Sequence, residues 1–226
     1  MIQFHNLFPT SIYHRKMEAY QEWNDVLLTK KEYMFDLDEN NHLTGESRGK
    51  VFLHKDEDLL PFFTDVSEAI EDMLYRMEVR TEMFYPYFMK SWFTIMSGGS
   101  QMKAHAHDCA DISFVYYVDP PKDTSICFQV EKSNNSYFPG IFHHKDEYRT
   151  HVRGYNALNS MVNAVPVESG DLIAFPSWMK HYVVDSPDTS VRVRSVAGDV
   201  KLMLNPDYED LETGLIHYTH WRKFKQ

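Results

Sequence analysis

The sequence is poor in cysteine and has no long apolar run. Its two cysteines, Cys109 and Cys127, are too few for a disulfide framework, so we expect both thiols to be reduced and unpaired. No apolar stretch approaches the roughly 20 residues that a membrane-spanning helix requires. The N-terminal residues MIQFHNLFPTSIYHRK also lack the basic flank and long apolar block of a signal peptide. We therefore expect a cytoplasmic protein that does not span a membrane.

An excess of positive charge is absent as well. The chain carries 23 lysines and arginines against 33 aspartates and glutamates, which gives a formal net charge of -10. Sequence-independent binding to nucleic acid depends on clustered basic side chains, so we predict no nucleic-acid partner. The charge is compatible with a small-molecule substrate or with a peptidyl one, including a basic peptide.

Hydrophobic residues, in contrast, are numerous enough to form a core. Hydrophobic residues make up 43% of the 226 residues and aromatic residues 15%, which is a globular composition. β-Rich chains of this length commonly form one unit. We therefore predict a single domain over residues 1–226.

Two stretches of the N-terminal third have apolar residues at helical spacing. The ranges 17–28 and 58–77 each present one apolar stripe. Pro61 falls in the first turn of the second stretch, where its missing N–H is harmless. We expect residues 1–81 to form a helical support.

From about residue 82 onward, β signals replace helical ones. Short aromatic and β-branched segments are separated by turn residues and do not alternate with helices, a pattern that favours an antiparallel sandwich or barrel. We expect residues 82–226 to form this core, with a long polar insert at about 131–163 that covers an active site or is mobile. The expected strands are 91–96, 111–118, 126–130, 172–175, 191–196 and 200–204.

Three histidines are the best candidates for chemistry. His105 and His107 lie two residues apart, so both rings project from the same side of an extended segment. A third ligand has to come from elsewhere, and His181, after a strand and a Pro-aromatic corner, is best placed. Neutral imidazoles suit Fe, Zn, Cu or Ni, so the ligand type alone does not select the metal.

Two arginines and two tyrosines could complete a binding site. Arg192 and Arg194 alternate with valines in an apolar strand, and an inward guanidinium would match a carboxylate in a bidentate pair. The alternative is an edge strand whose arginines face water. Tyr116 and Tyr117 are adjacent, so one of them faces inward, where a phenol needs a hydrogen-bond partner or serves as core packing.

These motifs together resemble a known enzyme family. The segment GDLIAFPSWMKHYV and the basic strand after it resemble the second half of the iron(II)- and 2-oxoglutarate-dependent oxygenases. The likeness is greatest to a bacterial and marine-phage branch that is distantly related to prolyl hydroxylases. The H-x-H pair and the strand SFVYYV resemble the earlier part of its core, and NLFPTSIY with the 58–77 helix resembles its opening.

The resemblance implies a mainly β fold with flanking helices. This fold is a double-stranded β-helix, a jelly-roll or cupin-like barrel, with the N-terminal helices packed on one sheet. The resemblance also implies iron at the barrel mouth, held by His105, His181 and one further ligand. It implies 2-oxoglutarate and O2 as co-substrates, with Arg192 pairing the distal carboxylate of 2-oxoglutarate and Tyr116 hydrogen-bonded to the same group. The expected reaction is hydroxylation of an amino acid, a peptidyl side chain or a small metabolite.

The chain departs from the family in its first ligand pair. Most members have H-x-D, which gives two histidines and one carboxylate, whereas this chain has His107 at the second position. We predict His105, His107 and His181 as the metal ligands, with Asp108 as the substitute for His107. Arg194 stands where relatives often carry a small polar residue, which makes it a candidate second anion-binding group.

Two other functions fit parts of the pattern. A cupin-type metal-binding isomerase or metabolite-binding protein would share the barrel and the H-x-H start. It would also carry a glutamate a few residues after the pair, whereas the next glutamate here is Glu131. A non-catalytic barrel module would bind neither metal nor 2-oxoglutarate, and the intact set of histidines and arginines argues against it.

Overall fold

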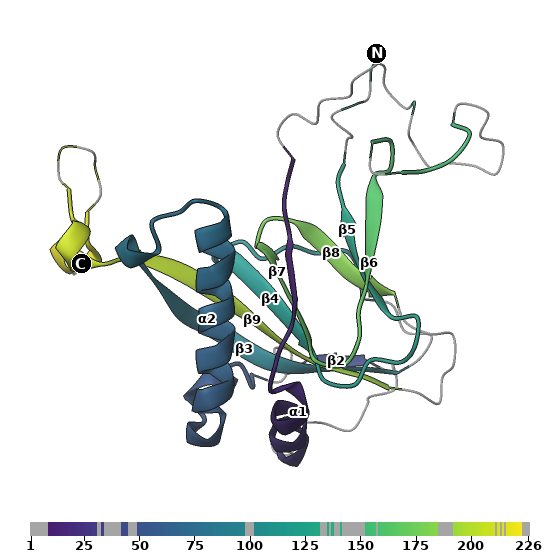
Figure 1. Ribbon diagram of the computed structural model, residues 1–226, viewed down its shortest axis with the longest axis horizontal. Coiled ribbons are helices and arrows are strands. Elements are labelled where there is room, and N and C mark those ends of the chain that lie inside the picture. Colours follow the sequence, from purple (N-terminus) through teal and green to yellow (C-terminus); the bar gives the residue numbers. More distant parts are fainter. Residues whose placement is uncertain are drawn as a thin grey trace.

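A computed structural model of the protein describes most of the chain. The described residues are 9–30, 33, 42–44, 49–97, 102–131, 135, 137, 141, 152–156, 158–184, 192–210, 212, 214 and 216–222. Two α-helices, five short 3-10 helices and nine strands lie within them (Figure 1). Among the described helices, none is both long and apolar enough to cross a membrane.

Six strands form the larger sheet, and every pairing in it is antiparallel. Their order across the sheet is β1-β7-β4-β9-β3-β2. The bounds are β1 Tyr13–Lys16, β2 His42–Thr44, β3 Phe84–Ser97, β4 Ile112–Tyr117, β7 Asp171–Pro176 and β9 Arg192–Leu204. The two longest strands, β3 and β9, pair along almost their whole length, with a register shift between Phe88 and Lys90.

The remaining strands form a smaller antiparallel sheet with the order β6-β5-β8. Their bounds are β5 Ser125–Gln129, β6 Val162–Pro166 and β8 Lys180–Val184. Side chains of β5 and β8 share one apolar core with the inward side chains of the larger sheet. We call this core the inner core; it includes Trp92, Met96, Val115, Tyr117, Ile126, Phe128, Ile173, Phe175, Val183, Val193 and Ala197.

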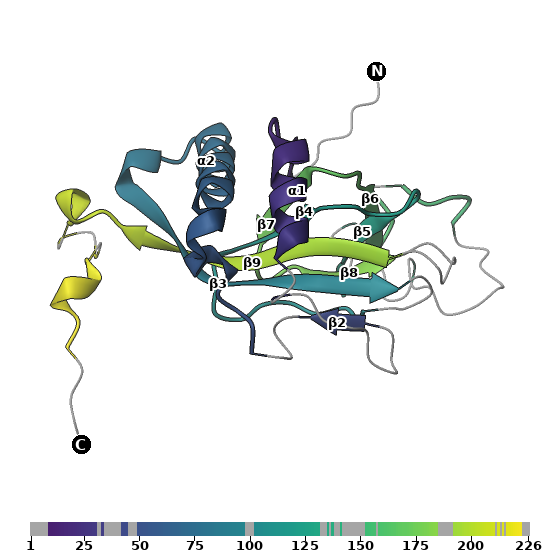
Figure 2. The ribbon, with the colours of Figure 1, turned by 90° about the horizontal axis from the view of Figure 1, so that it is seen from below.

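Both helices, α1 (Tyr20–Thr29) and α2 (Leu60–Arg76), cover the opposite face of the larger sheet (Figure 2). The apolar stripe of α2 packs there, and Pro61 lies in its first turn. Trp23 of α1 donates its indole N–H to Asp65 of α2 at 2.8 Å. We call the core beneath the helices the helix-side core; it includes Trp23, Leu27, Phe62, Phe63, Val66, Ile70, Phe93, Phe114, Tyr116, Leu172, Val196 and Val200.

Strand alternation divides neighbouring residues between the two cores. Tyr116 belongs to the helix-side core and Tyr117 to the inner core. The register explains this division, because Tyr116 pairs with Val196, whereas Tyr117 pairs with Ser195 and successive side chains of a strand point to opposite faces. A shift of one residue along β4 therefore decides which core receives a side chain.

The structure confirms the predicted fold class of strands with flanking helices on one sheet. The helices expected at 17–28 and 58–77 are α1 and α2, with slightly different ends. The prediction of two separate strands at 191–196 and 200–204 is wrong, because the structure has one continuous strand there, β9. Most of the predicted insert at 131–163 lies outside the described residues, although β6 begins at its end. The single-domain organisation stays a prediction.

Candidate functional site

The three histidines named from the sequence meet at the end of the inner core. Backbone hydrogen bonds place them: the N–H of His105 donates to the carbonyl of His181 at 3.1 Å, and the reverse bond measures 2.9 Å. These two residues thus form an antiparallel bridge. The N–H of His107 donates to the carbonyl of Ser177 at 2.9 Å. Main-chain bonds therefore bring together side chains that are far apart in sequence.

The rings converge closely enough to share one ion. One ligand nitrogen from each of His105, His107 and His181 lies within 4.8 Å of the others. The ring centroids of His105 and His181 are 4.5 Å apart, and each is 5.3 Å from that of His107. Asp108, the predicted substitute for His107, is exposed and lies outside this group. The structure brings His107, and not Asp108, to the other two histidines.

Hydrogen bonds at Nδ1 set the tautomer of all three rings. Each Nδ1 lies beside an oxygen that can only accept, so in the neutral ring Nδ1 carries the hydrogen and Nε2 keeps the lone pair. The three bonds are His105 Nδ1 to Lys103 O at 2.9 Å, His181 Nδ1 to Met179 O at 3.0 Å, and His107 Nδ1 to Asp199 Oδ1 at 2.5 Å. The arrangement leaves three Nε2 lone pairs as potential metal ligands.

Burial keeps the deepest ring in the neutral form that binds metals. His181 is only 5% exposed, and burial lowers its pKa from 6.5 to about 4. The other two histidines also lower this pKa, whereas the hydrogen bond to Met179 and the charge of Asp199 act in the opposite direction. At neutral pH the ring is therefore uncharged.

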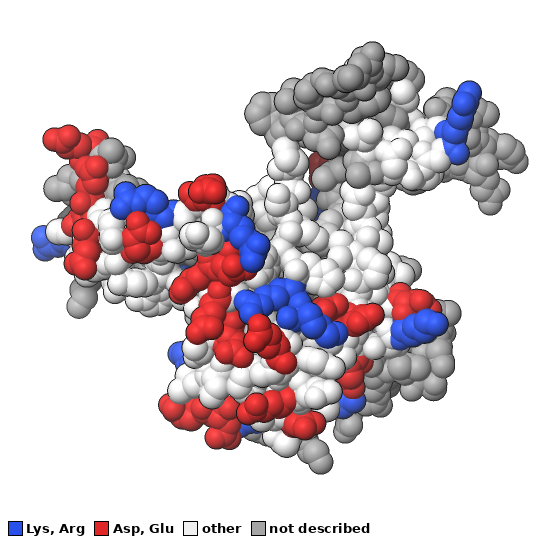
Figure 3. Space-filling model, in the orientation of Figure 1, with Lys and Arg blue, Asp and Glu red and all other residues white. Residues whose placement is uncertain are grey.

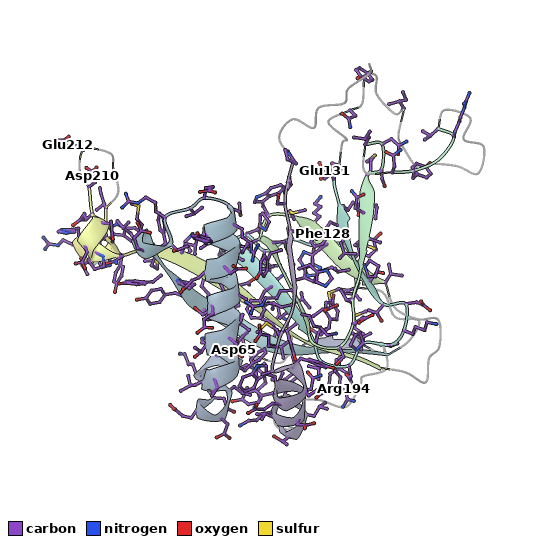
Figure 4. The ribbon with its side chains drawn as sticks, viewed as in Figure 1. Asp65, Phe128, Glu131, Arg194, Asp210 and Glu212 are labelled. Carbon is purple, nitrogen blue, oxygen red and sulfur yellow. The ribbon has the colours of Figure 1, made fainter. Side chains whose placement is uncertain are left out.

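Aromatic rings line the group. Phe175 and Phe128 lie 4.6 Å and 6.4 Å from the His181 ring, measured between centroids. Trp92 stacks on His107 at 5.7 Å with an interplanar angle of 24°. Figure 4 labels Phe128 among the strands of the smaller sheet. These rings hold the imidazoles in place and give the group an apolar wall.

A buried carboxylate that the sequence reasoning missed completes the group. Asp199 of β9 is 3% exposed and accepts the His107 hydrogen bond. Ser113 Oγ also donates to Asp199 Oδ1, at 2.8 Å. The available signal in the sequence was an acidic residue inside an apolar strand, since Asp199 stands between Gly198 and Val200. Buried acids need partners, but the sequence does not indicate which partner.

Tyr116, the predicted hydrogen-bond partner of 2-oxoglutarate, lies in the helix-side core and not in the inner core. Its hydroxyl lies on the helix side, where it donates to Asn24 Oδ1 at 2.7 Å, and its ring packs on Phe62 at 5.0 Å. Tyr117 faces the inner core instead. The Tyr117 hydroxyl is buried and has no hydrogen-bond partner within the described part of the chain.

The structure describes the side chain of only one of the two predicted arginines, Arg194. Arg194 forms an ion pair with Asp119, with Nε at 3.0 Å from Oδ1. Figure 4 shows Arg194 close to α1 and well apart from Phe128. The predicted second anion-binding role of Arg194 therefore has no support, because its guanidinium is engaged elsewhere. Arg192 begins β9 with its backbone opposite Ser97, and its side chain lies outside the described residues.

The donor set fits a first-row transition metal. Three imidazole nitrogens with lone pairs suit Fe, Ni, Cu or Zn, and a site with only three protein ligands leaves positions open for substrate or water. Within the described residues, these histidines are the one group of three or more potential ligands. The geometry therefore agrees with a catalytic metal centre.

A family model matches the segment that carries this group. Residues 90–199 match the family described as "Putative 2OG-Fe(II) oxygenase", where 2OG denotes 2-oxoglutarate. The matched segment includes all three histidines and ends at Asp199. No curated protein matches the chain.

Several solved structures share the fold. A prolyl-4-hydroxylase from Pseudomonas putida aligns with a TM-score of 0.52 and 8% identity over 85% of this chain and 92% of its own. A 2OG-Fe(II) oxygenase family protein from Burkholderia pseudomallei aligns with a TM-score of 0.52 and 8% identity over 84% of each chain. A Trichoplax adhaerens prolyl hydroxylase, in complex with a hypoxia inducible factor peptide fragment, aligns with a TM-score of 0.52 and 10% identity over 85% of this chain and 84% of its own.

At these identities the structural likeness establishes the fold alone, which confirms the predicted jelly-roll class. The family match over the segment with the histidines confirms the resemblance seen in the sequence. Residues 90–199, just under half of the chain, are therefore similar to the iron(II)- and 2-oxoglutarate-dependent oxygenases.

Proposed function

We propose that the protein hydroxylates an amino acid, a peptidyl side chain or a small metabolite at an iron held by His105, His107 and His181. Iron bound there supplies, with 2-oxoglutarate and O2, the oxidation of an unactivated C–H bond while 2-oxoglutarate becomes succinate and CO2. The observation that carries this proposal is the shared Nδ1 pattern. Three rings whose Nδ1 atoms are occupied and whose Nε2 atoms are free form a prepared ligand set.

Tyr117 is our candidate for holding 2-oxoglutarate. A buried hydroxyl without a partner costs about 1–3 kcal/mol, and a carboxylate oxygen beside it would remove that cost. Burial raises the pKa of Tyr117 above its usual value, so the phenol stays protonated and can donate. Arg192 stays the predicted ion-pair partner of the distal carboxylate.

The aromatic wall contributes to the proposed chemistry by excluding water. Phe128 and Phe175 are both almost fully buried beside His181. A site closed to bulk water protects a reactive oxidant from side reactions. The substrate therefore has to approach from the side of the group that these rings leave open.

The acidic charge of the chain does not select a substrate. On the face shown in Figure 3, acidic and basic side chains gather over α1 and α2, whereas the surface over β5 and β6 is mostly uncharged. Long-range charge affects encounter rates more than chemistry. We therefore do not choose between an amino acid, a peptidyl side chain and a small metabolite as the substrate. Succinate release measured with candidates of each class distinguishes them.

An anaerobic titration with iron(II) and 2-oxoglutarate tests the metal site. We expect a weak visible charge-transfer band in the wild type and its loss in His181→Ala, because that variant lacks the most buried ligand. His220→Gln is the matched control, since His220 is exposed and its ring contacts Glu209 instead; its band should equal that of the wild type. An undiminished band in His181→Ala would refute the ligand assignment.

A further inference from the structure

The group that accepts the Nδ1 hydrogen bond of His107 differs in kind from those that accept the bonds of His105 and His181. His105 and His181 each donate to a backbone carbonyl two residues earlier in the chain, at Lys103 and Met179. Any residue type at those positions offers the same neutral acceptor. His107 alone donates to a side-chain carboxylate, that of Asp199, which is 92 positions away in sequence.

The surroundings of Asp199 keep its carboxylate directed at His107. Oδ1 accepts from both His107 Nδ1 and Ser113 Oγ, and Lys90 Nζ lies 3.9 Å from Oδ2. All three neighbours are donors, and the carboxylate is 3% exposed. Trp92 stacks on the other side of the same imidazole. The ring of His107 is thus fixed both at its edge and on its face.

This carboxylate is hydrogen-bonded to His107, which occupies a position at which the chain departs from the pattern of most family members. Most members place an aspartate where this chain has His107. We infer that Asp199 is a positioning residue that supplies, through the imidazole of His107, the negative charge that an aspartate would otherwise bring to the metal directly. This inference rests on the proposed function, because it needs His107 as a metal ligand.

Two effects on the metal follow from this arrangement. The hydrogen bond fixes the ring so that Nε2 faces the other two histidines, and the nearby negative charge makes Nε2 a stronger donor. Loss of such a partner typically weakens metal binding by about 10- to 100-fold. A residue that only supports the fold would lower stability and leave the metal affinity of the folded protein unchanged.

Asp199→Asn separates charge from shape, because the amide oxygen can still accept from Nδ1 while the charge is lost. The probe is cobalt(II), titrated anaerobically into the full chain and followed by its visible absorption bands. We expect about 10- to 100-fold weaker binding and a shift of the bands. Asp171→Asn is the matched control: Asp171 is a buried acid on the same sheet that contacts His14 and Lys16, and its variant should bind cobalt like the wild type.

Wild-type affinity and unshifted bands in Asp199→Asn would overturn the inference. Should that variant fail to fold, Ser113→Ala decides, because it removes the hydrogen bond to the carboxylate along with a bond to Ser177 Oγ. Ser177→Ala, which loses only the second bond, is its control. Cobalt binding that is weaker in Ser113→Ala than in Ser177→Ala supports the inference, and equal binding overturns it. A wild-type protein that binds no cobalt would instead refute the proposed function itself. The two failures are therefore distinguishable.

Discussion

The two faces of the six-stranded sheet bury different chemistry. On the helix side, apolar side chains from α1 and α2 fill the core, and the polar group of Tyr116 is paired with Asn24. On the inner side, the His181 imidazole, the Asp199 carboxylate and a phenol without a partner in the described residues are buried beside apolar rings, with the half-buried imidazoles of His105 and His107 next to His181. A buried polar group without a partner is costly in a core, so the Tyr117 hydroxyl, on the same face as the three imidazoles, indicates a site that receives a ligand.

The comparison shows how one sheet serves stability and chemistry separately. Because successive side chains of a strand point to opposite faces, β4 contributes Tyr116 to one core and Tyr117 to the other. Substitutions on the helix side should therefore change the free energy of unfolding with little effect on the site. Substitutions on the inner side should change ligand binding.

The largest effect on stability is expected for Phe62→Ala. Phe62 is 1% exposed and packs on Phe63 and Tyr116 at 5.0 Å and on Trp23 at 6.4 Å. Truncation of a buried phenylalanine removes about 3–5 kcal/mol of unfolding free energy. Urea unfolding measures that loss, and iron titration of the folded variant should give wild-type affinity.

Phe128→Ala provides the inner-side counterpart to this variant. Phe128 contacts Phe175 and lies near His181, so we expect a loss of stability together with weaker iron binding. Equal iron affinities for the Phe62 and Phe128 variants would contradict the separation of the two faces.

A smaller and more selective contrast is expected from the adjacent tyrosines. Tyr116→Phe removes the hydrogen bond to Asn24 and should cost about 1 kcal/mol of unfolding free energy, with 2-oxoglutarate affinity unchanged. Tyr117→Phe removes a hydroxyl without a partner in the described residues, so we expect unchanged or higher stability and weaker 2-oxoglutarate binding. Urea unfolding and 2-oxoglutarate titration of both variants check the pair; the opposite assignment of effects would contradict it.

The smallest expected effect concerns the pH dependence of stability on the helix side. Burial, with a further contribution from Lys55, lowers the pKa of His54 below its usual 6.5. The unfolded chain therefore binds more protons at His54 when the pH falls below about 6.5, and stability decreases there. Unfolding measured from pH 7 to pH 5 should show a shallower decline in His54→Gln than in the wild type; an equal decline would argue against this contribution.

The sequence predicted those features that depend on local pattern. The apolar stripe of 58–77 became α2, and the H-x-H spacing with His181 indicated a group that the structure brings together. The break predicted in β9 was wrong because Gly198 is not a turn. A Cβ at Gly198 would lie 2.5 Å from Cε1 of Phe114, so glycine there permits close packing within a continuous strand.

Features that depend on strand register and on contacts between distant segments could not be predicted from the sequence. The choice between Tyr116 and Tyr117 needed the pairing of β4 with β9, since both tyrosines have the same local environment in sequence. Asp199 of β9 contacts His107, which is 92 positions away in sequence, and no local pattern predicts that contact. Arg194 has an acidic partner, Asp119, that likewise comes from a distant segment.

The most direct test of the central claim is a crystal structure of the protein loaded with iron(II) under anaerobic conditions. The account predicts one ion bound by Nε2 of His105, His107 and His181, with Nδ1 of His107 still hydrogen-bonded to Asp199. An ion that Asp108 binds in place of His107, or an ion that does not touch His181, would contradict it.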